Sequence, residues 1–89
     1  RKLFSDLQEV VIDYAGLSPD DLEYSTVHAA ISRGRIVESR VEANPAVNGA
    51  RVVLSFETEG PETAELRVDL KRGDESLAET WLYRWVDDY

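Results

Sequence analysis

Residues 63–71 alternate between apolar and charged side chains, and this alternation constrains the fold more than any other feature of the sequence. Successive side chains of a β-strand point to opposite faces of the sheet, so the pattern predicts a strand with one buried and one hydrated face. A strand of this kind is typical of an antiparallel sheet that packs on a core from one side. The residues predicted to face the core are Ala64, Leu66, Val68 and Leu70.

Five other segments have the β-branched and aromatic residues and the alternation that are typical of strands. They are residues 9–14, 24–32, 35–43, 51–57 and 77–86. The charges of segment 35–43 mark it as an exposed or edge strand, because charged side chains prevent pairing with other chains. These charged residues are Arg35, Glu38, Arg40 and Glu42. About six short strands with turn signals between them indicate an all-β sandwich, and we expect one domain over residues 1–89.

Glycine, proline and asparagine mark the connections between these strands. Gly16 ends the first strand, and Ser18-Pro19 then has the character of a helix start, with a capping serine and a proline at the first helical position. Two aspartates follow near the positive end of the helix dipole, which predicts a short helical connector at residues 18–23. The other turn signals are Arg33-Gly34, Asn44-Pro45, the positive-φ pair Asn48-Gly49, Gly60-Pro61 and residues 72–75.

Both ends of the chain are expected to lie outside the strands. Apolar residues from Leu3 to Tyr14 fit a helical spacing, but the β-branched run from Val10 favours a strand, so residues 1–8 are interpreted as a lead-in. Residues 87–89 are interpreted as a frayed tail. The chain begins with arginine and lacks a signal peptide, and on this ground it is interpreted as a fragment of a larger protein.

Trp81, Tyr83 and Trp85 are spaced by two residues and would share one face of a strand. Such a stripe either fills the core or presents a flat aromatic surface on which sugar rings can stack. Three exposed rings would form a patch at the upper limit for soluble monomers, and the reverse orientation would bury an unpaired arginine. Core packing is therefore favoured. Leu82 and Val86 would then face outwards, as in a domain that is docked on a neighbour.

The charge balance argues against polyanionic partners. Ten Lys and Arg residues stand against eighteen Asp and Glu residues, a formal net charge of −8. Phosphate binding needs clustered basic residues, so nucleic acid and anionic membrane surfaces are disfavoured. No run approaches the roughly 18 apolar residues of a membrane span. The sequence has no cysteine, which excludes disulfides and thiolate metal sites.

The sequence predicts no catalytic residue, no metal site and no cofactor. His28 is the only histidine and no nucleophile is placed to use it, so we interpret it as structural. Adjacent acids at residues 20–21 and 87–88 are expected by chance among eighteen acids, and the five glycines form no phosphate-binding motif. Residues 72–74 spell the cell-adhesion tripeptide Arg-Gly-Asp, but a turn between two strands needs Gly and Asp in any case, so the adhesion role is disfavoured.

Five stretches carry a family resemblance that extends over about residues 9–86. They are VIDYAG at 11–16, SRGRI at 32–36, VEANP at 41–45, NGAR at 48–51 followed by Phe56, and LAETWLYRW at 77–85. The last stretch is the most specific. On these residues the chain resembles the C-terminal domain of the periplasmic glucan biosynthesis protein G/D family, which acts in making osmoregulated periplasmic glucans in Gram-negative bacteria.

The resemblance implies an immunoglobulin-like β-sandwich that follows a much larger N-terminal β-sandwich domain. The glucan groove, and β-1,2-glucan hydrolase activity where present, would belong to that larger domain. This chain is then expected to be a monomeric, non-catalytic accessory or docking domain in the periplasm, with the N-terminal domain as its partner and β-glucan as a second one. Two alternatives stay open: a generic protein-interaction sandwich, or a carbohydrate-binding module that uses Trp81, Tyr83 and Trp85.

Overall fold

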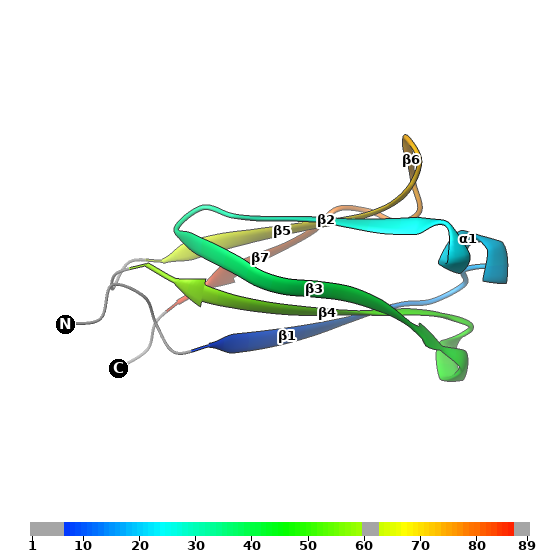
Figure 1. Ribbon diagram of the computed structural model, residues 1–89, viewed down its shortest axis with the longest axis horizontal. Helices are drawn as coiled ribbons and strands as arrows, with labels where there is room; N and C mark the ends of the chain where they lie inside the picture. The colour runs from blue at the N-terminus through cyan, green and yellow to red at the C-terminus, as the bar shows by residue number, and fades with distance from the viewer. Residues whose placement is uncertain (1–6, 60–62, 87–89) are drawn as a thin grey trace.

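The computed structural model describes residues 7–59 and 63–86, which form two antiparallel sheets packed face to face (Figure 1). One sheet has the order β1 (Gln8–Tyr14), β4 (Gly49–Thr58), β3 (Gly34–Asn44). The second sheet places β2 (Ser25–Ile31) on one side of β5 (Ala64–Arg72), and β6 (Glu75–Ser76) and β7 (Trp81–Trp85) on the other. Helix α1 (Pro19–Glu23) and the 3₁₀ turn η1 (Pro45–Val47) complete the described elements. The predicted all-β sandwich is confirmed.

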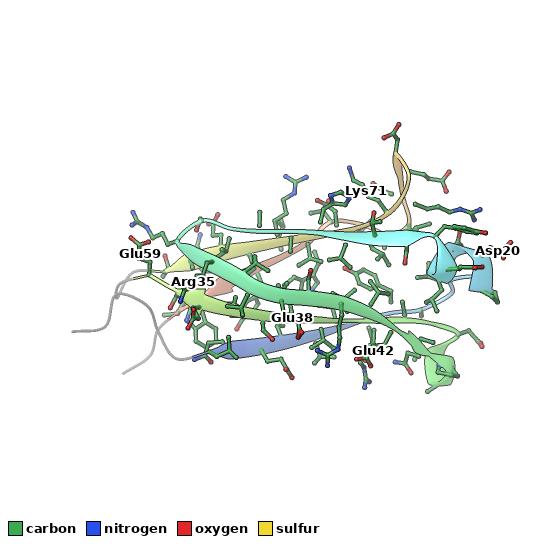
Figure 2. The ribbon with its side chains drawn as sticks, viewed as in Figure 1. Asp20, Arg35, Glu38, Glu42, Glu59 and Lys71 are labelled. Atoms are coloured by element: carbon green, nitrogen blue, oxygen red, sulfur yellow. The ribbon has the colours of Figure 1, made fainter. Side chains whose placement is uncertain are left out.

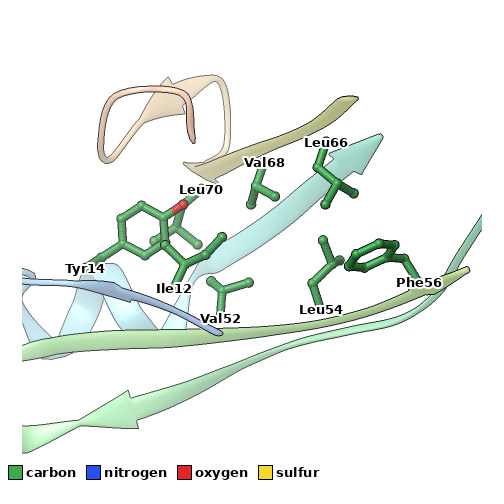
Figure 3. Close-up of a cluster of buried hydrophobic side chains, with 8 residues drawn as sticks. All are labelled: Ile12, Tyr14, Val52, Leu54, Phe56, Leu66, Val68 and Leu70. Carbon is green, nitrogen blue, oxygen red and sulfur yellow. The ribbon is translucent and has the colours of Figure 1, made fainter. Parts of the chain in front are cut away.

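The core lies between the two central strands, β4 and β5, with β1 adding to it (Figure 3). Alternate residues of each strand point into this layer, as the sequence pattern predicted. Exclusion of their apolar surface from water supplies the main stabilisation of the sandwich. The buried cluster consists of Ile12, Tyr14, Val52, Leu54, Phe56, Leu66, Val68 and Leu70.

Helix α1 connects the two sheets at one end of the sandwich and forms where the sequence predicted a helical connector. Ser18 caps it: the backbone N–H of Asp21 donates to Ser18 Oγ at 3.0 Å, and the backbone N–H of Ser18 donates to Asp21 Oδ2 at 3.3 Å. Pro19 occupies the first helical position, where its missing N–H costs nothing. This capping box satisfies two donors that the start of a helix otherwise leaves unpaired.

The Asn48-Gly49 pair departs in part from its prediction. Asn48 has the expected left-handed backbone, with φ of 51°. Gly49 does not have a positive φ and begins strand β4 instead. A glycine is required here because the backbone of β1 lies very close: a Cβ atom at this position would be 1.7 Å from the carbonyl oxygen of Tyr14. The absence of a side chain therefore lets β4 pass against the end of β1.

Strand β3 lies at the edge of its sheet, as its charges predicted (Figure 2). A β-bulge interrupts its pairing with β4 between Ile36 and Glu38, so Val37 is an extra residue. Arg35 precedes the bulge and Glu38 follows it, and both face outwards because one extra residue exchanges the two faces of the strand. The charged side chains of β3 therefore face water both before and after the bulge.

The last predicted strand, residues 77–86, is shorter than expected, and this is a correction. Only Trp81–Trp85 forms β7, while the two-residue strand β6 precedes it along the same edge of β5. Lys71 pairs with Ser76, and Val68 pairs with Trp81. The two β5 residues are three positions apart in the sequence, whereas their partners are five positions apart. Segment 77–80 accommodates the two extra residues. The backbone N–H of Leu77 still donates to the carbonyl oxygen of Leu70 at 2.9 Å, and the chain then departs from the β5 ladder. Because the shift in pairing is an even number of residues, each β7 side chain keeps the face of the sheet that the alternation predicted for it.

Several predictions fall on residues outside the described ranges. These are most of the lead-in, residues 1–6, the Gly60-Pro61 break and the tail 87–89. Leu7 is described and is exposed without regular structure, and β1 begins at the next residue, Gln8. Within the described residues, no helix has the length and apolar character to cross a membrane.

Candidate functional site

Strand β7 turns its aromatic stripe towards the core. In antiparallel pairing, directly opposed residues point to the same face of the sheet. The pairs are Trp81 with Val68, Tyr83 with Leu66 and Trp85 with Ala64, and all three β5 partners are fully buried. Trp81 and Trp85 are partly buried and pack against the hydrophobic core. Trp81 and Trp85 therefore pack on the core as predicted, whereas Tyr83, which was predicted to be buried with them, remains exposed.

The three rings do not form one flat surface. Trp81 and Tyr83 stack with their ring centroids 5.6 Å apart and an angle of 14° between the planes. Trp85 instead meets Phe56 edge to face, with centroids 5.7 Å apart and an angle of 81°. The indole nitrogen Nε1 of Trp85 is buried and has no hydrogen-bond partner in the described part of the chain. The stripe therefore consists of a stacked pair and a separate core ring.

Tyr83 is the most accessible ring of the stripe, with 45% of its surface exposed. It borders a shallow hollow of about 240 Å³ that is also lined by Glu65, Leu66, Leu82 and Arg84. An Arg84 guanidinium N–H donates to Glu65 Oε1 at 3.3 Å, and both side chains are largely exposed. The hollow thus brings an exposed ring next to a charged donor and a charged acceptor, a combination that suits a polar cyclic ligand.

The sequence pattern did not reveal that Glu65 and Arg84 are neighbours. Their contact depends on the register between β5 and β7, which the two extra residues in segment 77–80 displace. The only signal available in the sequence is that both residues occupy outward positions of their strands. Many other pairs of charged residues in this chain share that property, so the pair could not be singled out.

Asp69 is held by two donors on the outer face of the second sheet. Thr80 Oγ1 donates to Asp69 Oδ1 at 2.5 Å, and Arg67 Nε donates to Asp69 Oδ2 at 3.1 Å. The hydrogen bond from Thr80, together with that from Arg67, keeps the pKa of Asp69 below its ordinary value of 3.8. This carboxylate is therefore ionised at neutral pH and bound to structural partners.

Asp13 is held in a similar way on the outer face of the first sheet. Arg51 donates from Nε to Oδ1 at 2.9 Å and from a terminal nitrogen to Oδ2 at 3.3 Å, and Asn44 Nδ2 donates to Oδ1 at 2.9 Å. The hydrogen bond from Arg51 dominates the lowering of the Asp13 pKa. A carboxyl group with a lowered pKa is unsuited to act as a general acid near neutral pH, which requires a raised pKa.

His28 and the Arg-Gly-Asp tripeptide both belong to the second sheet and its turns. His28 is exposed on β2, and its Nε2 lies 3.2 Å from Thr26 Oγ1. Arg72 donates to Asp21 Oδ1 at 3.1 Å, and its guanidinium lies 5.3 Å from the centroid of the Tyr24 ring. The tripeptide forms the turn between β5 and β6, as predicted. Among residues 7–59 and 63–86, no three His, Asp or Glu side chains are grouped so that they could hold a metal ion.

Comparison with known proteins decides the family. A sequence model of the family described as "Periplasmic glucan biosynthesis protein, MdoG" matches residues 2–85. The chain belongs to this family. The MdoG family match confirms the resemblance drawn from the five sequence stretches, and the description of the family places its members in the periplasm.

Individual members of the MdoG family align with nearly the whole chain. Glucans biosynthesis protein G 2 of Shewanella oneidensis is 46% identical over 81 residues, which cover 91% of this chain and 15% of the relative. Glucans biosynthesis protein G of Shewanella putrefaciens is 42% identical over 88 residues, which cover 97% of this chain and 15% of the relative. The chain therefore spans about 15% of the length of the curated relatives that it matches.

Proposed function

We propose that this chain is a non-catalytic accessory domain of a periplasmic protein for the biosynthesis of osmoregulated β-1,2/β-1,6-glucans. One observation carries the proposal: the chain corresponds to 15% of relatives named glucans biosynthesis protein G, yet it folds around a core of its own. A small sandwich attached to a much larger polypeptide is suited to support or position its neighbour. Glucan chemistry would then belong to the remainder of the protein.

The state of the acidic side chains supports a non-catalytic role. Glycoside hydrolysis uses a carboxyl group with a raised pKa beside a second carboxylate. Asp13, Asp21 and Asp69 instead have lowered pKa values, because arginine side chains and hydroxyl groups donate hydrogen bonds to them. The Asp13 carboxylate links β1 to β4, the Asp69 carboxylate links β5 to segment 77–80, and the Asp21 carboxylate caps α1, all of which are structural tasks.

An activity assay on the 89-residue chain tests this proposal. The purified chain is incubated with linear β-1,2-glucan and with β-1,6-linked glucan, and newly formed reducing ends are measured. We expect none above the buffer control. In cells, the full-length protein without this domain should yield less periplasmic glucan than the intact protein. Formation of reducing ends by the isolated chain would contradict the proposal.

A second candidate function is carbohydrate binding, and the hollow beside Tyr83 favours it. Aromatic rings stack on pyranose rings, and the Glu65–Arg84 pair could hydrogen-bond to sugar hydroxyls. Titration of the chain with β-glucan oligosaccharides, followed by amide NMR shifts, tests this function. Shifts centred on Tyr83 that disappear in Tyr83→Ala would support it, whereas unchanged spectra at millimolar sugar would exclude it.

A further inference from the structure

Leu82 is the most exposed of the large apolar side chains in the described residues, with 70% of its surface accessible. Val86 directly follows β7 and is 55% exposed. On the outward face of the second sheet, Leu82 is paired across the ladder with Arg67, which is paired in turn with Ala30 of β2. We call Ala30, Arg67, Leu82, Arg84 and Val86 the β7 surface.

The β7 surface has the relief and the polarity of an interface. Leu82 borders two hollows, one of about 240 Å³ beside Tyr83 and one of about 340 Å³ beside Ala30. Arg67 and the Glu65–Arg84 ion pair surround this apolar centre. Protein interfaces commonly combine an apolar centre with a polar rim, and a protruding side chain flanked by hollows offers a complementary shape to a partner.

The other exposed apolar residues are scattered over the molecule. Leu7 directly precedes β1, Val11 lies on the outer face of the first sheet, Val37 in the β3 bulge and Val47 in η1. Tyr24 is 58% exposed but lies beneath the guanidinium of Arg72. Single exposed apolar residues are normal on a soluble protein, and Leu82 is distinguished from them by the two hollows that it borders.

The position of the β7 surface in the fold indicates what covers it. Strand β1 begins and β7 ends at the same end of the sandwich, whereas α1 and η1 lie at the opposite end (Figure 1). The relatives are far longer than this chain, which spans 15% of their length. A domain joined to either end of the chain would therefore attach at the end of the sandwich where β7 ends, away from α1.

We infer that the β7 surface is the docking surface for the remaining polypeptide of the same protein, with Leu82 as its central contact. This inference rests on the proposed accessory function and adds its partner and its residues. Burial of Leu82 and Val86 removes apolar surface from water. The rim residues Arg67, Glu65 and Arg84 retain their ion pairs within reach of the partner.

Hydroxyl-radical footprinting of the full-length protein and of the 89-residue chain tests the inference. Oxidation of Leu82 and Tyr83 should be slower in the full-length protein by about five-fold, because the centre of an interface is desolvated. Tyr24, the residue that ends α1, provides an internal reference and should be oxidised at equal rates in both proteins, because α1 lies at the other end of the sandwich. Equal oxidation of Leu82 in both proteins, or protection of Tyr24 as strong as that of Tyr83, would overturn the inference.

Two variants of the full-length protein separate docking from folding. Leu82→Glu should restore rapid oxidation of Tyr83, whereas Val11→Glu, a matched change on the first sheet, should leave Tyr83 protected. Both side chains are exposed, so the Tm of the isolated chain should change by no more than about 3 °C in either variant. Persistent protection of Tyr83 in Leu82→Glu would overturn the inference.

The remaining outcomes identify other occupants. Protection of Leu82 that grows with the concentration of the isolated chain would assign the surface to a second copy. Protection that requires added β-glucan would assign it to carbohydrate, and either result overturns the inference. The docking inference and the proposed function can fail separately. A non-catalytic domain that leaves Leu82 exposed in the full-length protein would fail the footprinting test but would still release no reducing ends in the activity assay.

Discussion

The contribution of a side chain to the stability of this sandwich depends on its surroundings more than on its residue type. Tyr14 shows this most clearly, because its ring fills the core while its hydroxyl group is buried and finds no hydrogen-bond partner among the described residues. Burial, with a smaller effect from the charge of Asp69, raises the pKa of Tyr14 above its ordinary value of 10.0. The apolar part of the ring stabilises the fold, and the hydroxyl group works against it.

Replacement of that hydroxyl should stabilise the protein. Tyr14→Phe is expected to raise the free energy of unfolding by about 1 kcal/mol, because a buried hydroxyl group without a partner costs about 1–3 kcal/mol. A raised pKa means that stability is fully present below pH 10 and is lost as the pH rises through the higher folded-state pKa, so the variant should also resist alkaline pH better. Urea denaturation at pH 7 and above pH 10 measures both effects. Tyr24→Phe is the exposed control, and a destabilised Tyr14→Phe variant would show that the hydroxyl group is bonded.

A second residue-scale prediction concerns Gly49. Gly49→Ala should lower the free energy of unfolding by about 2–3 kcal/mol, because its Cβ atom would meet the Tyr14 carbonyl oxygen and β1 would have to move. The backbone of Gly49 is one that alanine readily adopts, so the loss would come from contact alone. Urea denaturation provides the measurement. A free energy of unfolding equal to that of the parent chain would show that β1 and β4 separate without cost.

At the scale of elements, β7 has two different faces. Its aromatic face lies against the core and β5, whereas its outward face carries Leu82 and Arg84 into water. Neighbouring residues on this strand should therefore respond very differently to truncation. The inward face should determine the stability of the second sheet, and the outward face should matter only when the rest of the protein is present.

Trp81→Ala and Leu82→Ala measure this difference directly. Trp81→Ala should cost about 3 kcal/mol, at the lower end of the range for a buried tryptophan, because its indole is only partly buried and stacks on Tyr83. Leu82→Ala should change stability by no more than about 0.5 kcal/mol, because its side chain is exposed. Chemical denaturation of the two variants gives both values. Similar losses at both positions would contradict the assignment of the faces.

At the scale of the whole molecule, the surface is acidic but many of its charges are paired. The net charge is −8, yet arginine side chains bridge acidic residues on both sheets and at α1. Exposed pairs of this kind contribute little individually, and their combined effect appears mainly in the response to pH. Three of the acidic partners, Asp13, Asp21 and Asp69, have lowered pKa values.

The protein should therefore lose stability in acid. A lowered pKa means that stability is present above pH 3.8 and is lost as the pH falls through the folded-state values, so the urea midpoint should fall between pH 5 and pH 3. Asp13→Asn should flatten this dependence, whereas Asp74→Asn, which removes an equal charge from the β5–β6 turn, should not. An acid dependence that Asp13→Asn leaves unchanged would show that the Arg51 contact does not contribute.

Local sequence patterns determined the fold class, the inward and outward faces of the strands, and the capped connector at α1. These features depend on the alternation of residues along a strand or on contacts a few residues apart, as at Ser18 and Asp21. The β3 bulge was not predicted: the charged positions of β3 change from odd to even after Arg35, but only the register with β4 shows that this change reflects an extra residue.

Only the tertiary structure decided which strands pair and in which register. Glu65 meets Arg84, Gly49 passes against Tyr14, and β6 is separated from β7, because chain segments far apart in sequence are brought together. The same is true of the β7 surface, whose residues come from β2, β5 and β7. Alternation repeats every two residues and is therefore unchanged by any even shift between strands, so the sequence determined the faces while packing determined the neighbours.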